Sequence, residues 1–165
     1  MSIEHSCPNE LRKQKDESPC IVDNEEPILY VILDPDHCKN GILTNAAFSK
    51  SKLKEGSLSV SRANYTTADQ LKKSVIDPQL IRNKERKFVG VIRATCHDIR
   101  AMRMSNENTR AICVIDDGTE NDTAHAHLSF SEKAKISPKN EQQAIRGNLV
   151  LKFQQNPVGL SEIFT

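Results

Sequence analysis

The sequence DDGTENDTAHAHLSF, residues 116–130, joins a polar, acidic turn to a segment that alternates between apolar and polar side chains. From residue 124 onward, apolar residues occupy the even positions, and His125, His127 and Ser129 occupy the odd ones. A β-strand has a side-chain period of two, so this spacing predicts a strand with two imidazoles and a hydroxyl on one face. That polar face is a candidate place for chemistry or for a partner.

Further apolar segments predict the rest of a sheet. The run at 28–33 (ILYVIL) is continuous and β-rich, which is typical of a strand buried on both faces. Residues 57–62 (SLSVSR) alternate and predict a half-buried strand. Three more strands are expected at 88–94, 111–115 and 149–153. Gly90 within the first of these indicates a bulge or a close backbone approach.

Helices are expected to be few and short. Thr67 followed three residues later by Gln70 matches a capping box, which predicts a helix to about residue 76. Asp77-Pro78 then either stops this helix or restarts it as a second turn to Ile81. Ser137 and Pro138 suit the N-cap and the first position of another helix, which should end at Gly147. About six strands, two or three short helices and no regular βαβ alternation favour an α+β fold. We expect a single mixed, mainly antiparallel sheet.

Length and composition fit one domain with two terminal segments. A chain of 165 residues with 37% hydrophobic residues has a lean core of the size expected for a single domain. Residues 1–26 are polar and charged and predict a disordered N-terminal arm, which either is idle or folds on a partner. The α+β domain is expected to span 27–154, followed by a C-terminal tail at 155–165.

Charge and hydrophobicity narrow the classes of partner. The net charge of +1 gives no electrostatic footprint for nucleic acid, and no apolar run approaches the ~20 residues of a membrane span. The first 20 residues lack the hydrophobic core of a signal peptide, which favours the cytoplasm. The five cysteines are scattered and odd in number and form no C-x-x-C pair, so we expect reduced thiols that act as small apolar fillers.

His125 and His127 are the candidate catalytic residues. Two positions apart on one strand face, they suit a general base, a substrate contact or a shared divalent ion. Asp116, Asp117 and Asp122 lie just upstream and offer oxygen ligands, but no spacing identifies a third metal ligand, so no metal ligands are predicted. The structural alternative is a hydrogen-bonded pair of histidines on an open face.

A second candidate site lies where the strand at 57–62 is followed by the helix opening near Thr67. Arg62, Tyr65, Thr66 and Thr67 are its predicted ligand-binding residues, because free N–H groups at a helix start and an arginine favour a phosphate or a carboxylate. The structural alternative is that Thr67 caps its own helix and Arg62 pairs with a surface acid.

Three segments, 56–69 (GSLSVSRANYTTAD), 88–100 (FVGVIRATCHDIR) and 116–130, resemble an uncharacterised bacterial family of small soluble proteins. That family shares a Leu-Ser-Val-x-Arg strand before Thr-Thr-Ala, and an Ala-His-Ala segment. The resemblance covers about 28–130 and implies no activity. The layout also resembles ADP-ribosyltransferase-like domains of the RES type, in which an arginine, a glutamate and a serine serve NAD chemistry. Only Arg62 has a loose counterpart among those residues.

The sequence favours a protein that binds another macromolecule, with a protein as the expected partner. The polar arm, the balanced charge and the absence of a complete catalytic set support this interpretation. The alternative is an enzyme acting on NAD, a nucleotide or a related phosphate ligand, with His125 or His127 as base and Arg62 as an anion clamp. NAD and a divalent metal ion are the candidate cofactors, and neither is predicted outright.

Overall fold

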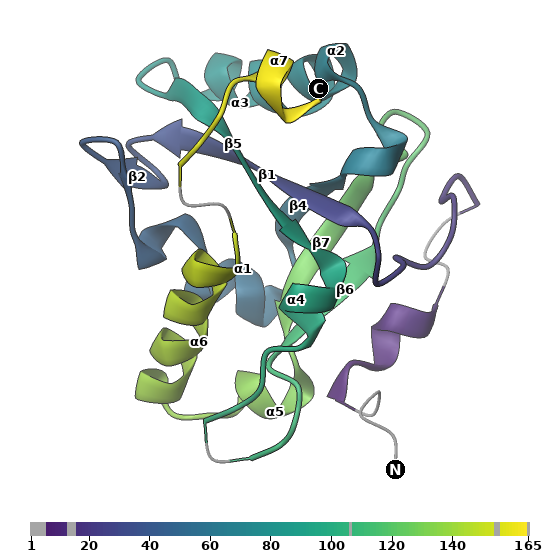
Figure 1. Ribbon diagram of the computed structural model, residues 1–165, viewed down its shortest axis with the longest axis vertical. Coiled ribbons are helices and arrows are strands. Elements are labelled where there is room, and N and C mark those ends of the chain that lie inside the picture. The colour runs from purple at the N-terminus through teal and green to yellow at the C-terminus, as the bar shows by residue number, and fades with distance from the viewer. Residues whose placement is uncertain (1–5, 13–15, 106, 154–155, 165) are drawn as a thin grey trace.

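The computed structural model describes residues 6–12, 16–105, 107–153 and 156–164. Its centre is a five-stranded sheet in the order β5-β1-β4-β7-β6, and every neighbouring pair is antiparallel (Figure 1). The strands are β1 (Pro27–Asp34), β4 (Leu58–Arg62), β5 (Lys87–Thr95), β6 (Ile112–Asp116) and β7 (His125–Phe130). A separate hairpin pairs β2 (Cys38–Lys39) with β3 (Ile42–Leu43). The α+β class with a mainly antiparallel sheet is therefore confirmed.

Helices cover both faces of this sheet, and among the described α-helices all except α6 are short. The α-helices are α1 (Lys50–Glu55), α2 (Ala68–Leu71), α3 (Asp77–Arg82), α4 (Cys96–Arg100), α5 (Glu132–Lys135), α6 (Lys139–Lys152) and α7 (Leu160–Ile163). The 3-10 turns are η2 (Pro8–Leu11), η3 (Asn45–Ala47) and η4 (Ala63–Tyr65), and η5 (Lys72–Ile76) is a π-helical turn. No helix of the described ranges is long and apolar enough to cross a membrane.

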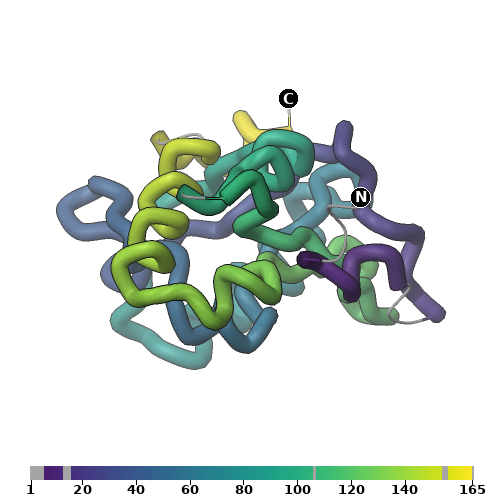
Figure 2. Tube along the Cα trace, turned by 90° about the horizontal axis from the view of Figure 1, so that it is seen from below, coloured from purple at the N-terminus to yellow at the C-terminus, as the bar shows by residue number. Residues whose placement is uncertain are grey.

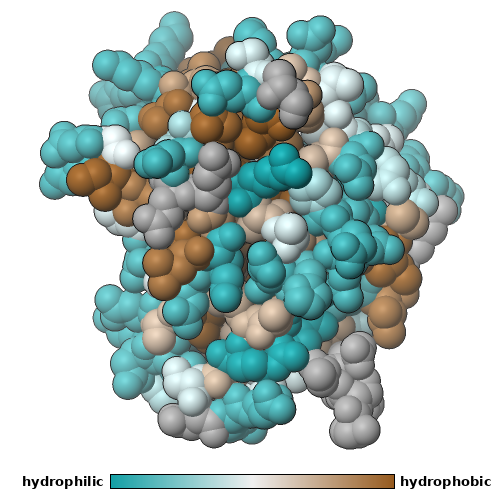
Figure 3. Space-filling model, in the orientation of Figure 1, coloured by the Kyte–Doolittle hydropathy of each residue, from teal (hydrophilic) through white to brown (hydrophobic). Residues whose placement is uncertain are grey.

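Both faces of β1 are buried, as its continuous apolar run predicts. The even-numbered residues from 28 to 32 pack into the larger core with α1, α4, α5 and α6. The odd-numbered residues from 29 to 33 pack beneath α2, η5, α3 and α7 on the other face (Figure 1). Around α7, at the top of the view, Figure 3 shows apolar side chains that reach the surface. The sheet is thus the middle of three layers.

The alternating segment forms β7 as predicted. Ala126, Leu128 and Phe130 are almost completely buried in the larger core. His125 and His127 lie on the opposite face with their ring centroids 4.7 Å apart. The antiparallel register places Ser59 of β4 opposite His127 and so brings the serine-rich strand beside the histidines.

One helix follows an expected course, and another extends beyond its predicted end. Thr67 caps α2 as expected, since its hydroxyl accepts a hydrogen bond from the Gln70 N–H at 3.2 Å. The helix then continues through η5 and α3 to Arg82, so the restart at Asp77-Pro78 is the one of the two expected outcomes that occurs. By contrast, α6 runs through Gly147 to Lys152, so the predicted strand at 149–153 is wrong. Leu149 packs into the larger core from a helix, because the short apolar run suits either structure.

The start of α6 also differs from the prediction. Pro138 occupies the N-cap, and the Ser137 hydroxyl instead donates to the carbonyl of Lys133 at 2.8 Å. Ser137 therefore closes the preceding turn, which follows α5.

Gly90 allows the C-terminal segment to approach β5 closely. Val158 forms an antiparallel bridge with Val91, and a Cβ atom built at Gly90 would lie 2.8 Å from the Val158 carbonyl oxygen. The pairing of β1 with β5 also shifts register between Ile32 and Leu33, opposite this point. The close approach and the irregularity expected at Gly90 are both present.

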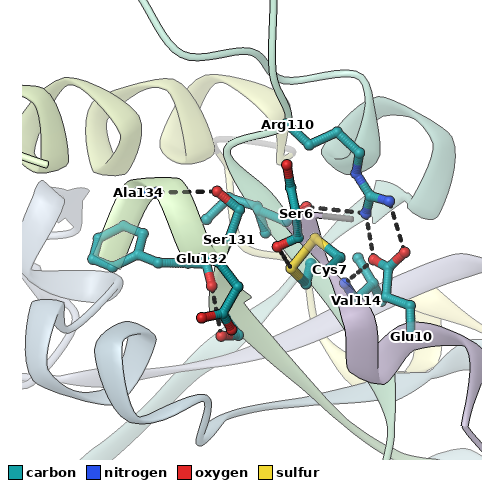
Figure 4. The surroundings of a disulfide bond; sticks show 12 residues. Ser6, Cys7, Glu10, Arg110, Val114, Ser131, Glu132 and Ala134 are labelled. Atoms are coloured by element: carbon teal, nitrogen blue, oxygen red, sulfur yellow. Dashed lines mark hydrogen bonds and ion pairs between the residues drawn. A yellow bond between two sulfur atoms is a disulfide. The ribbon is translucent and has the colours of Figure 1, made fainter. Parts of the chain in front are cut away.

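The structure differs from the prediction of a disordered arm at 1–26. Residues 6–12 and 16–26 are described, and η2 lies beside β6 in Figures 1 and 2. A disulfide joins Cys7 to Cys113 of β6, and the buried Glu10 carboxylate accepts hydrogen bonds from Arg110 and from the Val114 N–H at 2.7 Å (Figure 4). Covalent and charge contacts fasten this segment, where composition alone gives little to bury.

The disulfide overturns the prediction that all five cysteines are reduced. Of the others, Cys38 and Cys96 are buried free thiols and Cys20 is exposed. Burial raises the pKa of Cys96 to about 12, so its thiol stays protonated at neutral pH. Cys38 and Cys96 therefore act as the small apolar fillers that the sequence predicts.

Candidate functional site

Arg62, a predicted anion-binding residue, is enclosed by protein. Its side chain has no exposed surface and forms ion pairs with Glu26 at 2.6 Å and Asp116 at 3.0 Å. It also donates a hydrogen bond of 2.7 Å to the Cys20 carbonyl oxygen. Three partners thus hold a guanidinium that solvent cannot reach. Arg62 fastens the 20–26 segment to the sheet and is not available to clamp a ligand.

The other residues of the predicted anion site have structural contacts as well. The Tyr65 ring lies over the Arg62 guanidinium, 4.6 Å from centroid to Cζ, and its hydroxyl lies 3.4 Å from Cys20 Sγ. Thr66 donates to the Thr67 carbonyl at 3.4 Å, while Thr67 caps α2. The Thr67 hydroxyl already accepts a hydrogen bond from the N–H of Gln70, so this helix start uses one of its free donors in its own cap. The structural alternative for this region therefore fits its geometry better.

The two histidines share a carboxylate. Asp117 follows the end of β6 and hydrogen-bonds back to β7, with its N–H 3.0 Å from the His125 carbonyl oxygen. Its Oδ2 atom lies 3.0 Å from Nδ1 of His125 and 3.5 Å from Nε2 of His127. All three side chains are about one-fifth exposed, so solvent reaches them. Of the three aspartates named by the sequence, Asp117 is the one that joins this cluster.

A hydroxyl completes a chain of hydrogen bonds through His125. Its Nε2 atom lies 3.0 Å from Oγ of Ser59, and its Nδ1 atom lies 3.0 Å from Oδ2 of Asp117. The imidazole therefore stands between a hydroxyl and a carboxylate at hydrogen-bonding distance on both sides. Ser59 is exposed, whereas its strand neighbours Leu58 and Val60 are buried.

A cavity of about 100 Å³ opens beside Ser59 and His125. It lies on the face of the sheet that η5 and α3 partly cover. Apolar side chains of β1 and η5 supply part of its wall, and polar groups of β4 and β7 supply another part: Leu29, Val31, Val75, Ser59, Ser61 and His125. Ser59 thus lines a small cavity whose walls are partly apolar and partly polar.

A third histidine, His37, lines the same cavity and is held neutral. Its Nδ1 atom accepts a hydrogen bond from the Leu33 N–H at 3.0 Å, which leaves the ring proton on Nε2. That nitrogen lies 3.3 Å from the Tyr30 hydroxyl, which itself donates to the Ala47 carbonyl. Burial lowers the pKa of His37 to about 4, although the nearby Asp36 acts in the opposite direction. His37 therefore supplies a fixed hydrogen-bond donor.

The sequence identified part of this cluster. The face shared by His125 and His127 follows from the period of β7, and the acidic turn contains Asp117. Ser59 was not singled out, although its outward position in the alternating segment 57–62 was expected. The missing information is which strands are neighbours, because the β4–β7 pairing joins residues 66 positions apart.

No protein-family model, no curated protein and no solved structure matches this chain. The resemblances to a bacterial family and to ADP-ribosyltransferase-like domains therefore stay predictions.

Proposed function

We propose that this protein is a hydrolase of small carboxylic esters, with Ser59 as nucleophile, His125 as general base and Asp117 as the group that orients the imidazole. The proposal rests on one observation, the chain of two 3.0 Å contacts that runs from Ser59 Oγ through His125 to Asp117 Oδ2. A nucleophile bonded to a base that a third group orients is the arrangement that activates a hydroxyl on unrelated folds.

The chemistry follows from the proton positions. With its ring proton on Nδ1 donated to Asp117, His125 presents the lone pair of Nε2 to the hydroxyl of Ser59. Oγ attacks the ester carbonyl carbon as its proton passes to Nε2, and the carboxylate stabilises the imidazolium that forms. Collapse of the intermediate expels the alcohol, which takes the proton from Nε2. Water, deprotonated by the same nitrogen, then cleaves the acyl-serine bond and restores the hydroxyl.

The size of the cavity favours a small substrate. A volume of about 100 Å³ suits a short acyl group. A phosphate ligand has less support, because Arg62 is enclosed and Arg86, at the cavity wall, pairs with Asp36 at 2.8 Å. An ester substrate is therefore favoured over NAD or a nucleotide.

Binding to a macromolecular partner stays a prediction with less support than before. One of its three supports is an unstructured arm, whereas residues 6–12 and 16–26 of that segment pack against the domain.

A fluorophosphonate probe tests the nucleophile directly, because it labels only an activated serine. We expect the full-length protein to be labelled at Ser59 and to hydrolyse p-nitrophenyl acetate. A metal chelator is included so that no metal ion occupies the histidines during the assay. Asp117→Asn should lower the labelling rate by at least about 100-fold, since general-base assistance is worth 10²–10⁴-fold.

The matched control is Ser57→Ala, which removes a nearby serine whose hydroxyl contacts Glu55 rather than a histidine. This variant should label like the wild type, whereas Ser59→Ala should not label. Equal labelling of wild type and Ser59→Ala, or none in a folded wild-type protein, would overturn the proposal.

We also propose that the protein works in an oxidising environment rather than in the cytoplasm that the sequence suggests. The Cys7–Cys113 disulfide supports this, because such bonds are rare where thiols are kept reduced. Alkylation of protein trapped directly from cells, followed by mass spectrometry of Cys7 and Cys113, tests it. Reduced thiols at both positions would favour the cytoplasm.

A further inference from the structure

The cluster of Asp117, His125 and His127 has the ligand types and the spacing of a transition-metal site. Imidazole nitrogen and carboxylate oxygen are ordinary zinc ligands, with bonds of about 2.0–2.2 Å. A regular tetrahedron with such bonds has ligand atoms about 3.3–3.6 Å apart. Here Asp117 Oδ2 lies 3.0 Å from Nδ1 of His125 and 3.5 Å from Nε2 of His127. All three ligand atoms lie within 4.8 Å of one another.

The backbone around these ligands is well defined by the sheet. His125 and His127 belong to β7, which pairs on both sides, with β4 and with β6. Asp117 is tied to the same strand by its N–H bond to the His125 carbonyl. Because each ligand side chain is about one-fifth exposed, a cation can reach the cluster and keep a water molecule as its fourth ligand.

The hydrogen bond between His125 and Ser59 is compatible with a metal ion bound to the other ring nitrogen of His125. Metal-binding histidines usually donate their second ring N–H to an acceptor, which sets the tautomer. With Nδ1 on the metal, Nε2 of His125 holds the ring proton, and Oγ of Ser59 lies 3.0 Å away to accept it.

We propose that Asp117, His125 and His127 bind a divalent transition-metal ion of the zinc type, and that the ion inactivates Ser59. The second part rests on the proposed hydrolase. In the active form Nε2 accepts the hydroxyl proton, whereas in the metal-bound form Nε2 carries a proton and donates it to Oγ. The metal thus reverses the direction of one hydrogen bond. The base is lost without any movement of the backbone, and Asp117 is withdrawn from its orienting role.

Calorimetric titration of the full chain with ZnCl₂ tests the metal site alone. We expect one ion per chain, and at least a 10-fold loss of affinity in His127→Ala. Magnesium should not compete, because Mg²⁺ prefers an all-oxygen octahedral shell. The matched control is His97→Ala, which removes an exposed histidine that also contacts an aspartate, Asp98, at 3.6 Å. Unchanged zinc affinity in His127→Ala, or an equal loss in His97→Ala, would overturn the site.

Fluorophosphonate labelling with and without zinc tests the switch. Saturating zinc should slow labelling of Ser59 by at least about 100-fold, the minimum expected when general-base assistance is lost. Ser59→Ala should still bind zinc, because the hydroxyl is not a ligand. Full-rate labelling of zinc-loaded protein would overturn the switch and leave the metal site standing. Absent labelling in chelator would instead overturn the hydrolase, and the calorimetry would still decide the metal site.

Discussion

Breaking the Cys7–Cys113 disulfide should strongly lower the free energy of unfolding. The bond closes a loop between residues 106 positions apart, so it lowers the conformational entropy of the unfolded chain. For a loop of that length the chain-entropy relation gives about 16 cal/mol/K, or about 4.8 kcal/mol at 25 °C. For a protein of 165 residues, this loss corresponds to a fall in Tm of about 10–15 °C.

Urea denaturation with and without a reductant measures this loss, and the Cys7→Ser/Cys113→Ser double variant should reproduce it. Cys20→Ser is the matched control, because Cys20 is an exposed free thiol, and its midpoint should stay near that of the wild type. If oxidised and reduced protein unfold at the same urea concentration, the loop-entropy reasoning is refuted. It is equally refuted if mass spectrometry shows that Cys7 and Cys113 remain unpaired under oxidising conditions.

Three further changes test other parts of the fold. Lowering the pH from 6.5 to 4 should lower the free energy of unfolding by up to about 3 kcal/mol through His37, whose pKa is about 4 in the folded protein and 6.5 in the unfolded chain. The unfolded chain binds a proton at this imidazole in that pH range, whereas the folded protein does not. Urea titrations at several pH values should show a weaker pH dependence of stability for His37→Gln. Glu26→Gln should destabilise by about 1.5–3 kcal/mol, since it weakens the hydrogen bonds to Arg62 while Asp116 still pairs with it, and an unchanged urea midpoint would contradict this. Gly90→Ala should cost about 1–3 kcal/mol, because the added methyl group would lie 2.8 Å from the backbone of the C-terminal segment; Gly159→Ala, with open space around it, should be close to neutral in thermal melts.

The sequence predicts the sheet well wherever side-chain period determines burial. β1, β4, β5, β6 and β7 all lie where apolar runs or alternation place them, because a buried sheet face requires such a pattern. The run at 149–153 was assigned wrongly because a few consecutive apolar residues suit a helix as well as a strand. Its helical identity comes from packing of α6 against the larger core.

Long-range partners account for what the sequence did not reveal. Glu10 pairs with Arg110 across 100 positions, and Ser59 meets His125 across 66. The helix and strand propensities of nearby residues contain no information about either contact. The hydrophilic composition of the N-terminal segment therefore predicts disorder, although Glu10 and Glu26 of this segment have buried partners in Arg110 and Arg62. The sequence locates the candidate site only as a pair of histidines, without Ser59.

Both outer strands of the sheet are shielded by the ends of the chain. Val158 bridges to Val91 on β5, and the segment around Cys7 lies along β6. Unpaired strand borders are templates for association with other molecules, which leads to aggregation. The two terminal segments thus cover the edge strands and should reduce edge-to-edge association. Tags or truncations that displace either segment should therefore lower the solubility of the protein even where its core stays folded.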